Sequence, residues 1–377
     1  MLFQKMSGKR TTTSMVSPGA PLQLWAWGKN YGGRLGLGDA YGTPYLNRSS
    51  PAQVGALTTW STAAVSSGHS LAVKTDGTLW AWGTGTYGNL GIGINNAFRS
   101  SPVQVGTLTT WSAVVADVPN LATKTDGTLW AWGQGTYGGH GLGDEISRSS
   151  PVQIGTLATW SKIAASQRRA LAIKTDGTLW AWGGNGKGPL GLSNNIHRSS
   201  PVQVGTLTTW RAVACGRYHT IATKTDGTLW TWGDNTDGRL GLGDVVYRSS
   251  PVQVGTLATW GEIAGGKTQT VSSKSDGTLW TWGLNNYGML GLGDSTHRSS
   301  PVQVGALTTW NAVATSDDFS FALKTDSTLW AWGRNSFGYL GLGNVVYRSV
   351  PVQVGTLARW TTIAKGAAAK HAIALRT

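Results

Sequence analysis

Hydrophobic and polar positions alternate in a short pattern that returns along nearly the whole chain. The string Leu-Trp-x-Trp-Gly occurs seven times, and each copy alternates as a half-buried β-strand does. From Trp80 onward the copies stand 50 residues apart, whereas the first interval is 55 because the stretch 40–47 is longer. A period of this length indicates a repeat architecture. The first tryptophans of the copies are Trp25, Trp80, Trp130, Trp180, Trp230, Trp280 and Trp330.

Two further markers keep the same period. A proline opens the string Pro-(Val/Ala)-Gln-(Val/Ile)-Gly in every unit, and a third tryptophan follows it. Three tryptophans in each of seven units account for all 21 in the chain, so none is left for a dedicated site.

The unit that begins at Trp210 predicts four short strands, which we place at 212–215, 220–224, 228–232 and 252–254. Asp226-Gly227 predicts a two-residue hairpin turn between the second and third strands. Pro251 precedes the fourth strand, where a missing N–H is tolerated. Four such strands cannot bury their own faces, but seven sheets arranged radially can, with Trp and Leu side chains packed between neighbours.

The sequence therefore predicts an all-β fold: a single seven-bladed β-propeller of four-stranded antiparallel blades over residues 21–377. The chain enters in mid-unit at 21–25 and leaves in mid-unit at 373–377, and the two fragments together make one blade. We expect the N-terminal strand to pair with the C-terminal strands and close the ring, which removes an exposed sheet edge. Residues 1–20 lie outside the repeat and are expected to form a flexible tail.

The formal net charge of +14 points toward nucleic acid, but the repeat itself places much of this charge. Regularly spaced cations either form a ring that attracts anions or are solvated and paired with the recurring aspartates, and the second arrangement is the commoner one. Nucleic acid is therefore not the favoured partner. The recurring arginines are Arg48, Arg99, Arg148, Arg198, Arg248, Arg298 and Arg348; the lysines are Lys74, Lys124, Lys174, Lys224, Lys274 and Lys324; the aspartates are Asp76, Asp126, Asp176, Asp226, Asp276 and Asp326.

No apolar run approaches the roughly 20 residues that a membrane span needs. Residues 1–20 are basic and polar and lack the apolar centre of a secretory signal. We therefore expect a cytoplasmic or virion-associated protein without a membrane span.

The repeating unit resembles that of the regulator of chromosome condensation family. The resemblance rests on Gly216-Arg-Tyr-His-Thr220, on Asp-Gly-Thr-Leu-Trp-Thr-Trp-Gly at 226–233 and on Asn235-x-x-Gly238-x-Leu240-Gly-Leu-Gly243, and it extends over residues 21–377. It implies a seven-bladed propeller that binds proteins through one face. The plain, nearly identical units look most like bacterial or phage members of the family.

Connections between consecutive antiparallel strands alternate between the two faces of a propeller. The loop between the first and second strands (the short loop) and the loop between the third and fourth (the long loop) share one face, here called the variable face. The second-to-third hairpin and the fourth-to-first connection share the other, the uniform face. The uniform face repeats Lys-Thr-Asp-Gly-Thr and Gly-Thr-Leu-Thr-Thr with little change, and the Gly-Thr-Leu-Thr-Thr string shows no evident backbone constraint that would explain this.

Residues on the variable face differ from unit to unit and mix basic, acidic and aromatic side chains, as protein-recognition patches do. Loops also drift without selection for binding, so the contrast between the faces favours a binding face without proving one. The candidate partner-binding residues of the short loops are His69, Arg168, Arg169, Arg217, Tyr218, Lys267, Gln269, Asp317, Asp318 and Phe319; those of the long loops are Tyr87, Tyr137, Tyr287 and Phe337.

The sequence contains no recognisable catalytic constellation, so we expect no enzyme, no cofactor and no metal site. The six histidines are spread over different units without zinc-like spacing. His140 replaces the leucine of the other six units, which predicts a local change at the surface. Asp317-Asp318 makes a poor cage for calcium because two adjacent loop side chains supply too few ligands. Cys215 lies in a small apolar strand, which predicts a buried, inert thiol.

The function predicted from the sequence is non-catalytic recognition or scaffolding, with a protein partner bound at the variable face. Two settings suit this function: an intracellular interaction module, or a phage virion or bacterial surface component. The alternative is a guanine-nucleotide exchange factor or a chromatin-associated regulator of the same repeat family. The partner and the oligomeric state are beyond what the sequence determines.

Overall fold

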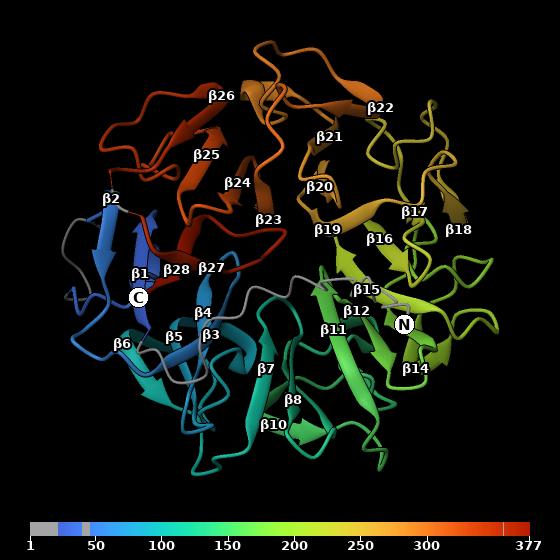
Figure 1. Cartoon of the computed structure of the whole chain (residues 1–377). Coiled ribbons are helices and arrows are strands. Elements are labelled where there is room, and N and C mark those ends of the chain that lie inside the picture. Colours follow the sequence, from blue (N-terminus) through green and yellow to red (C-terminus); the bar gives the residue numbers. More distant parts are fainter. Residues whose placement is uncertain (1–21, 40–45, 357) are drawn as a thin grey trace, which may run out of the picture.

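The computed structural model describes residues 22–39, 46–356 and 358–377. Within them, seven four-stranded antiparallel sheets stand in a ring around a central axis (Figure 1). The predicted all-β, seven-bladed propeller is confirmed. The predicted tail at 1–20 lies outside the described residues.

Six blades are continuous in sequence, and we number them from the N-terminus. Blade 1 contains β3 (Trp60–Val65), β4 (His69–Lys74), β5 (Leu79–Gly85) and β6 (Ala97–Gln104); blade 2 contains β7 (Trp111–Val115), β8 (Asn120–Lys124), β9 (Leu129–Gly133) and β10 (Arg148–Gln153); blade 3 contains β11 (Trp160–Ser166), β12 (Arg169–Lys174), β13 (Leu179–Gly183) and β14 (Arg198–Gln203). Blade 4 contains β15 (Trp210–Cys215), β16 (His219–Lys224), β17 (Leu229–Gly233) and β18 (Arg248–Gln253); blade 5 contains β19 (Trp260–Gly265), β20 (Gln269–Lys274), β21 (Leu279–Gly283) and β22 (Arg298–Gln303); blade 6 contains β23 (Trp310–Thr315), β24 (Phe319–Lys324), β25 (Leu329–Gly333) and β26 (Arg348–Gln353). Short 3₁₀ turns occur in long loops at η1 (Tyr31–Gly33), η2 (Thr86–Gly88), η3 (Thr136–Gly138) and η4 (Asn286–Gly288).

Blade 7 is composite and closes the ring as predicted. Its strand order is β2 (Arg48–Gln53), β1 (Gln23–Gly28), β28 (His371–Arg376) and β27 (Trp360–Ile363), so each end of the chain supplies two strands. β1 pairs with β28 from Gln23↔Arg376 to Gly28↔His371. In Figure 1 the blue β1 accordingly lies beside the red β28.

Tryptophans of the third strands form the packing between blades. Trp82 of β5 is fully buried in a cluster that also holds Leu24 and Ile373 of blade 7. Its indole Nε1–H donates to the carbonyl of Arg34, in the long loop of blade 7, at 2.9 Å. Equivalent bonds cross each of the six remaining blade boundaries; one of them runs from Trp27 to the carbonyl of Tyr339.

Two local predictions from the sequence are corrected by the structure. Pro251 lies inside β18 and not before it, because β18 is an outermost strand and its ladder to β17 is interrupted between Thr231 and Gly233. The hairpin is not a two-residue Asp-Gly turn: Gly227 N–H donates to the carbonyl of Lys224, and only Gly227 has a positive φ, 83°. This is a three-residue loop with glycine at the bulge position. Asp226 Oδ1 instead accepts from the N–H and hydroxyl of Thr228.

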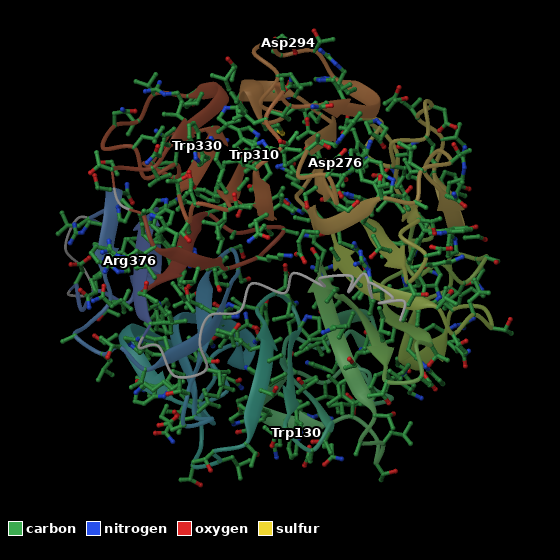
Figure 2. All side chains as sticks on the ribbon, viewed as in Figure 1. Trp130, Asp276, Asp294, Trp310, Trp330 and Arg376 are labelled. Atoms are coloured by element: carbon green, nitrogen blue, oxygen red, sulfur yellow. The ribbon has the colours of Figure 1, made fainter. Side chains whose placement is uncertain are left out.

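The regularly spaced charges have different partners from those expected. The lysines lie over tryptophan rings; Lys74 Nζ is 3.6 Å from the ring centroid of Trp80, a cation–π contact. Four of the arginines pair with aspartates of the long loops, as in Arg298–Asp294 at 2.6 Å. Figure 2 shows Asp294 at the outer rim of the ring. The repeated charges therefore serve local structure, although Arg99, Arg198 and Arg348 form no ion pair with a described residue.

Candidate functional site

The uniform face owes its regularity to backbone ties between neighbouring units. Thr75 N–H in the hairpin of blade 1 donates to the carbonyl of Thr59 at 2.8 Å, and Trp111 N–H donates to the carbonyl of Gly77 at 3.0 Å. A Cβ atom at Gly77 would fall 2.0 Å from the carbonyl oxygen of Thr109. The Gly-Thr-Leu-Thr-Thr connection is thus constrained, contrary to the sequence interpretation. These bonds explain why the path of its backbone is the same in successive units.

The residue that follows or ends each short loop has a structural role. This residue opens the second strand of its blade and is buried in every blade. The seven residues are His69, Asn120, Arg169, His219, Gln269, Phe319 and His371. Four of them, His69, Arg169, Gln269 and Phe319, were predicted to bind a partner, but their side chains are at most 2% exposed and contact neighbouring segments of the protein.

These contacts form a chain of interactions across the blade boundaries. His69 Nε2–H donates to Asn120 Oδ1 at 2.6 Å, and His371 Nε2–H donates to Ser70 Oγ at 2.6 Å. Gln269 Nε2 donates to the carbonyl of Ser316. Burial lowers the pKa of His69 to about 4, and it holds the pKa of His371 well below the ordinary range. These histidines are therefore neutral structural groups near pH 7.

The other predicted residues reach the surface of the variable face. Tyr87, Tyr137, Tyr218 and Tyr287 expose between 37% and 51% of their surface, which is high for aromatic residues. The rest are exposed or half-buried: Arg168, Arg217, Lys267, Asp317, Asp318 and Phe337. The structure thus separates an inner ring of packing residues from an outer set that solvent reaches.

The acidic pair on this face is neutralised by neighbouring cations. Lys267 Nζ lies 3.5 Å from Asp317 Oδ1, and Arg334 Nη1 lies 3.0 Å from Asp318 Oδ2. Burial and the adjacent Asp318 carboxylate raise the pKa of Asp317. Across the described ranges, no three His, Cys, Asp or Glu side chains gather as metal ligands.

A pocket of about 530 Å³ opens on the variable face between blades 2, 3 and 4. It unites five of the predicted residues, Tyr137, Arg168, Arg169, Arg217 and Tyr218. Its lining also includes Lys187, which occupies the same variable long-loop position as Tyr137, and Asp234, which the sequence analysis did not single out. Asp234 occupies the position directly after Trp-x-Trp-Gly, which is Lys, Thr, Gln, Gly, Leu or Arg in the other units. This variability between units is the feature of the sequence from which Asp234 could have been predicted as a candidate residue.

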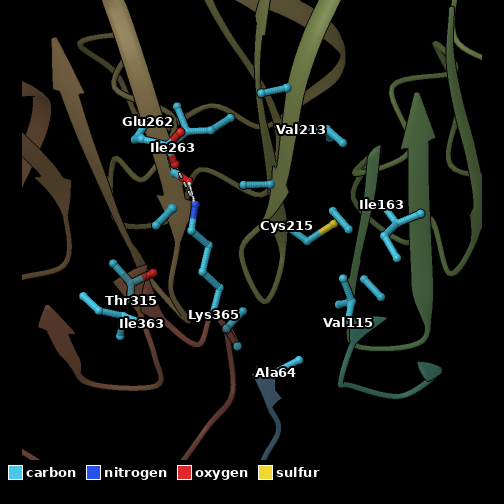
Figure 3. Close-up of a pocket in the computed structure, with 18 of the residues that line it drawn as sticks. Ala64, Val115, Ile163, Val213, Cys215, Glu262, Ile263, Thr315, Ile363 and Lys365 are labelled. Carbon is cyan, nitrogen blue, oxygen red and sulfur yellow. Dashed lines mark hydrogen bonds and ion pairs between the residues drawn. The ribbon is translucent and has the colours of Figure 1, made fainter. Parts of the chain in front are cut away.

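A second pocket, of about 320 Å³, lies on the axis and is lined by first strands of all seven blades. Figure 3 shows its small, mostly apolar side chains, with Cys215 near Val213 and one ion pair, Lys365–Glu262. Cys215 is buried as predicted, and burial raises the pKa of its thiol to about 11, which disfavours the nucleophilic thiolate.

His140 corrects a further prediction. It is fully buried, not at the surface, and its Nε2–H donates to the carbonyl of Gly133 at 2.8 Å. The imidazole therefore replaces leucine inside the blade by satisfying one polar group internally.

A family model described as the RCC1-like domain matches residues 23–374. The chain belongs to the RCC1-like domain family. This confirms the resemblance inferred from the repeating unit, and it covers the propeller as the structure describes it.

Solved structures similar to this RCC1-like chain include Prp20p from Saccharomyces cerevisiae, whose study addressed binding to Gsp1p and histones. The match has 19% identity and a TM-score of 0.83, and it covers 95% of this chain and 92% of that one. Yeast RCC1 (Prp20) with bound Kap60 also matches, with 19% identity, a TM-score of 0.83 and coverage of 100% and 96%. Human WBSCR16 matches with 21% identity, a TM-score of 0.83 and coverage of 94% and 100%. At these identities the likeness concerns the fold.

No helix in the described part of this RCC1-like chain is both long and apolar enough to span a bilayer.

Proposed function

We propose that this RCC1-like propeller is a non-catalytic recognition or scaffolding protein whose protein partner binds the variable face. The observation that carries the proposal is the set of four exposed tyrosines in the loops of that face, two of which, Tyr137 and Tyr218, line a charged pocket. Tyrosine and arginine are the side chains that most often anchor protein interfaces.

Charged side chains are unevenly distributed over the variable face: cations gather around a pocket that also holds Asp234, and the acidic pair lies beside its partner cations Lys267 and Arg334. Arg168, Arg217 and Lys187 lie around the pocket of blades 2–4, whereas Asp317 and Asp318 lie on blade 6. A partner with complementary charges would be oriented on the ring by this distribution, because charge complementarity sets register more than it adds affinity.

Affinity capture with two matched variants tests this proposal. The first variant replaces Tyr87, Tyr137, Tyr218 and Tyr287 by asparagine, which tolerates the positive φ that three of these positions adopt. The second replaces exposed leucines of the uniform face, Leu157, Leu207 and Leu257, by serine. Both variants would first be shown to keep the native near-UV circular dichroism.

We expect a partner captured by the native chain to be lost with the tyrosine variant and kept with the leucine variant. The reverse pattern would place recognition on the uniform face and refute the proposal.

The proposed setting is a phage virion or a bacterial surface, where the protein would serve attachment or decoration. Only 13% of the residues are charged, and the strands are rich in Thr, Ser and Gly, which suits such a surface component. Copurification with assembled particles, and loss of attachment when the chain is removed, would support this setting.

The net charge of +14 favours one second candidate, a chromatin-associated or exchange-factor role. That role predicts DNA affinity that falls steeply with salt, because cations on a protein displace counterions from phosphates. DNA affinity that does not change with salt, or no DNA binding, would exclude the chromatin role. A nucleotide-exchange assay with candidate GTPases would test the exchange-factor role.

A further inference from the structure

The pocket between blades 2, 3 and 4 has more positive than negative charge at its walls. Arg168, Arg169, Lys187 and Arg217 line it, and Asp234 is the one carboxylate among its lining residues. Asp234 is already engaged, since it lies 3.3 Å from Lys187 Nζ and 3.6 Å from Arg239 Nη1. The remaining arginines of the pocket therefore have unmatched charge.

Arg169 is the most informative of these residues. Its side chain is 2% exposed, and it donates to the carbonyls of Arg217, Gly216 and His219 at 2.8, 2.6 and 2.9 Å. Within the described part of the chain it forms no ion pair, and its Nε–H has no hydrogen-bond acceptor. The buried carboxyl of Asp117 acts on this guanidinium electrostatically without forming an ion pair. An anion in the pocket would further offset the cost of burying the cation.

Two aromatic side chains complete the walls. Tyr137 lies 4.4 Å from His197 between ring centroids, with the Arg168 guanidinium 5.4 Å from its ring. The Arg217 guanidinium lies 5.3 Å from the ring of Tyr218. Both arginines are thus held over aromatic faces. The side-chain oxygen of Gln167 accepts from Nε and Nη2 of Arg217 at 2.9 Å each, so Nη1 of Arg217 remains for a ligand.

The short loop of blade 3 has an unusual backbone. Gln167 and Arg168 adopt φ values of 46° and 69°, whereas the described short loops of the other blades contain no non-glycine residue with positive φ. Such conformations cost about 1 kcal/mol or more each and are typically retained where a side chain must be placed for function.

We propose that this pocket binds an oxyanion carried by a side chain of the protein partner, either a phosphate ester or a carboxylate. This inference rests on the proposed function. A protein is favoured over a nucleic acid because Asp234 and Asp237 border the site and the acidic pair Asp317–Asp318 shares its face, which interrupts any basic track that a phosphate backbone would follow.

The test is calorimetric titration of the full chain with small probes that need no partner: inorganic phosphate, phenyl phosphate and glutarate, with phenol as the neutral control. We expect saturable binding of the anions that weakens as salt is added. Tighter binding of phenyl phosphate than of glutarate would assign a phosphorylated side chain, and the opposite order would assign an acidic one.

Three variants locate the site. Arg168→Ser combined with Arg217→Ser should weaken anion binding by about tenfold or more, since each removes a charge-assisted hydrogen bond. Arg169→Gln should also weaken it while the fold is kept, because Gln269 at the equivalent position of blade 5 bonds the equivalent carbonyl. Arg99→Ser, in the outermost strand of blade 1 and outside the pocket, is the matched control and should leave anion binding unchanged.

The inference is overturned if no anion binds, or if the anions bind all variants equally. It is also overturned if a short DNA duplex binds far more tightly than the small anions and loses that affinity in the Arg168→Ser, Arg217→Ser variant. These results are independent of partner capture: a partner retained by the tyrosine variant refutes the proposed face, whereas absent anion binding refutes only the pocket.

Discussion

At the scale of residues, neighbouring positions in one loop have different roles. Arg168 points to solvent and Arg169 is buried, although the sequence places them side by side in the most basic short loop. The buried position varies because its residues meet different neighbours. Histidine meets a hydroxyl or an amide of the next blade, glutamine meets a carbonyl of the next blade, and Phe319 stacks on Tyr339 in the long loop of its own blade at 5.0 Å between ring centroids. A residue that differs from unit to unit can therefore differ because of its packing contacts and not only because it binds a partner.

The buried histidines predict that stability falls in mild acid. Above pH 6.5, His69, His219 and His371 are neutral in both the folded and the unfolded state. Below it only the unfolded chain takes up protons readily, because burial lowers the folded pKa of His69 to about 4 and those of the other two well below 6.5. Each histidine should reduce the free energy of unfolding by up to about 1.4 kcal/mol per pH unit in this window.

Urea midpoints between pH 7 and pH 4.5 measure this effect. A variant with His69→Gln, His219→Gln and His371→Gln should lose less stability on acidification, whereas exposed His297→Gln should behave as the native chain does. The raised pKa of Asp117 acts in the opposite direction but is common to all variants. Equal acid sensitivity of the triple variant would contradict the prediction.

Ser327 marks a backbone position where glycine should be better. It has a φ of 64° at the hairpin position that glycine occupies in the other five complete hairpins. Ser327→Gly should raise the free energy of unfolding by about 1 kcal/mol, because glycine adopts this region without strain. Gly277→Ser should destabilise, since its Cβ would fall 2.0 Å from the Thr308 carbonyl oxygen. Thermal melting compares the two, and a loss of stability on Ser327→Gly would show that the strain argument is wrong.

At the scale of elements, a single strand carries two tryptophans with different roles. Trp182 of β13 is fully buried and donates across the blade boundary to the carbonyl of Gly139 at 2.9 Å. Trp180 is half-buried, and its indole Nε1–H donates to the hydroxyl of Thr178 in its own blade. Lys174 Nζ lies 3.7 Å from the centroid of the Trp180 ring. Alternation of side chains along the strand makes one a boundary residue and the other a surface residue.

This difference predicts unequal costs for the same substitution. Trp182→Phe should lower the free energy of unfolding by about 2 kcal/mol or more, because it leaves a cavity and an unpaired carbonyl. Trp180→Phe should cost about 1 kcal/mol or less, since Trp180 is half-buried and its partner Thr178 keeps its hydrogen bond to Asp176. Urea denaturation followed by near-UV circular dichroism measures both, and similar losses would mean that the boundary bond contributes little.

At the scale of the whole molecule, closure of the ring in blade 7 is the step that joins segments far apart in the sequence. The strand β1 pairs with β28 across nearly the full length of the chain, and Trp27 donates to the carbonyl of Tyr339 in blade 6. The blades pack mainly on their two neighbours, and the Lys365–Glu262 pair joins blades 7 and 5 across the axis. The ring therefore depends on this one composite sheet to join its ends.

A circular permutant tests the role of closure. Thr377 would be joined to Gln23 by Asp-Gly, which restores the hairpin of the other blades, and new ends would be placed in the exposed connection at Leu57. We expect the same fold with a lower urea midpoint, because the seam between blades 7 and 1 then lacks a backbone ladder that closes the ring. A urea midpoint equal to or above the native one would show that side-chain packing between blades 7 and 1 is enough to hold the ring closed.

Periodicity, alternation and turn-forming residues were enough to predict the seven units, the four strands of each and the composite closing blade. The family was inferred from the resemblance of the repeated motifs. The sequence also placed the exposed tyrosines and Arg168, Arg217 and Tyr218 on the correct face. Only the tertiary structure showed that His69, Arg169, Gln269 and Phe319 pack against other segments and that Asp234 and Lys187 join the pocket. These assignments depend on contacts between residues about 50 positions apart, and no local pattern in one unit records which side chain of the next unit it will meet.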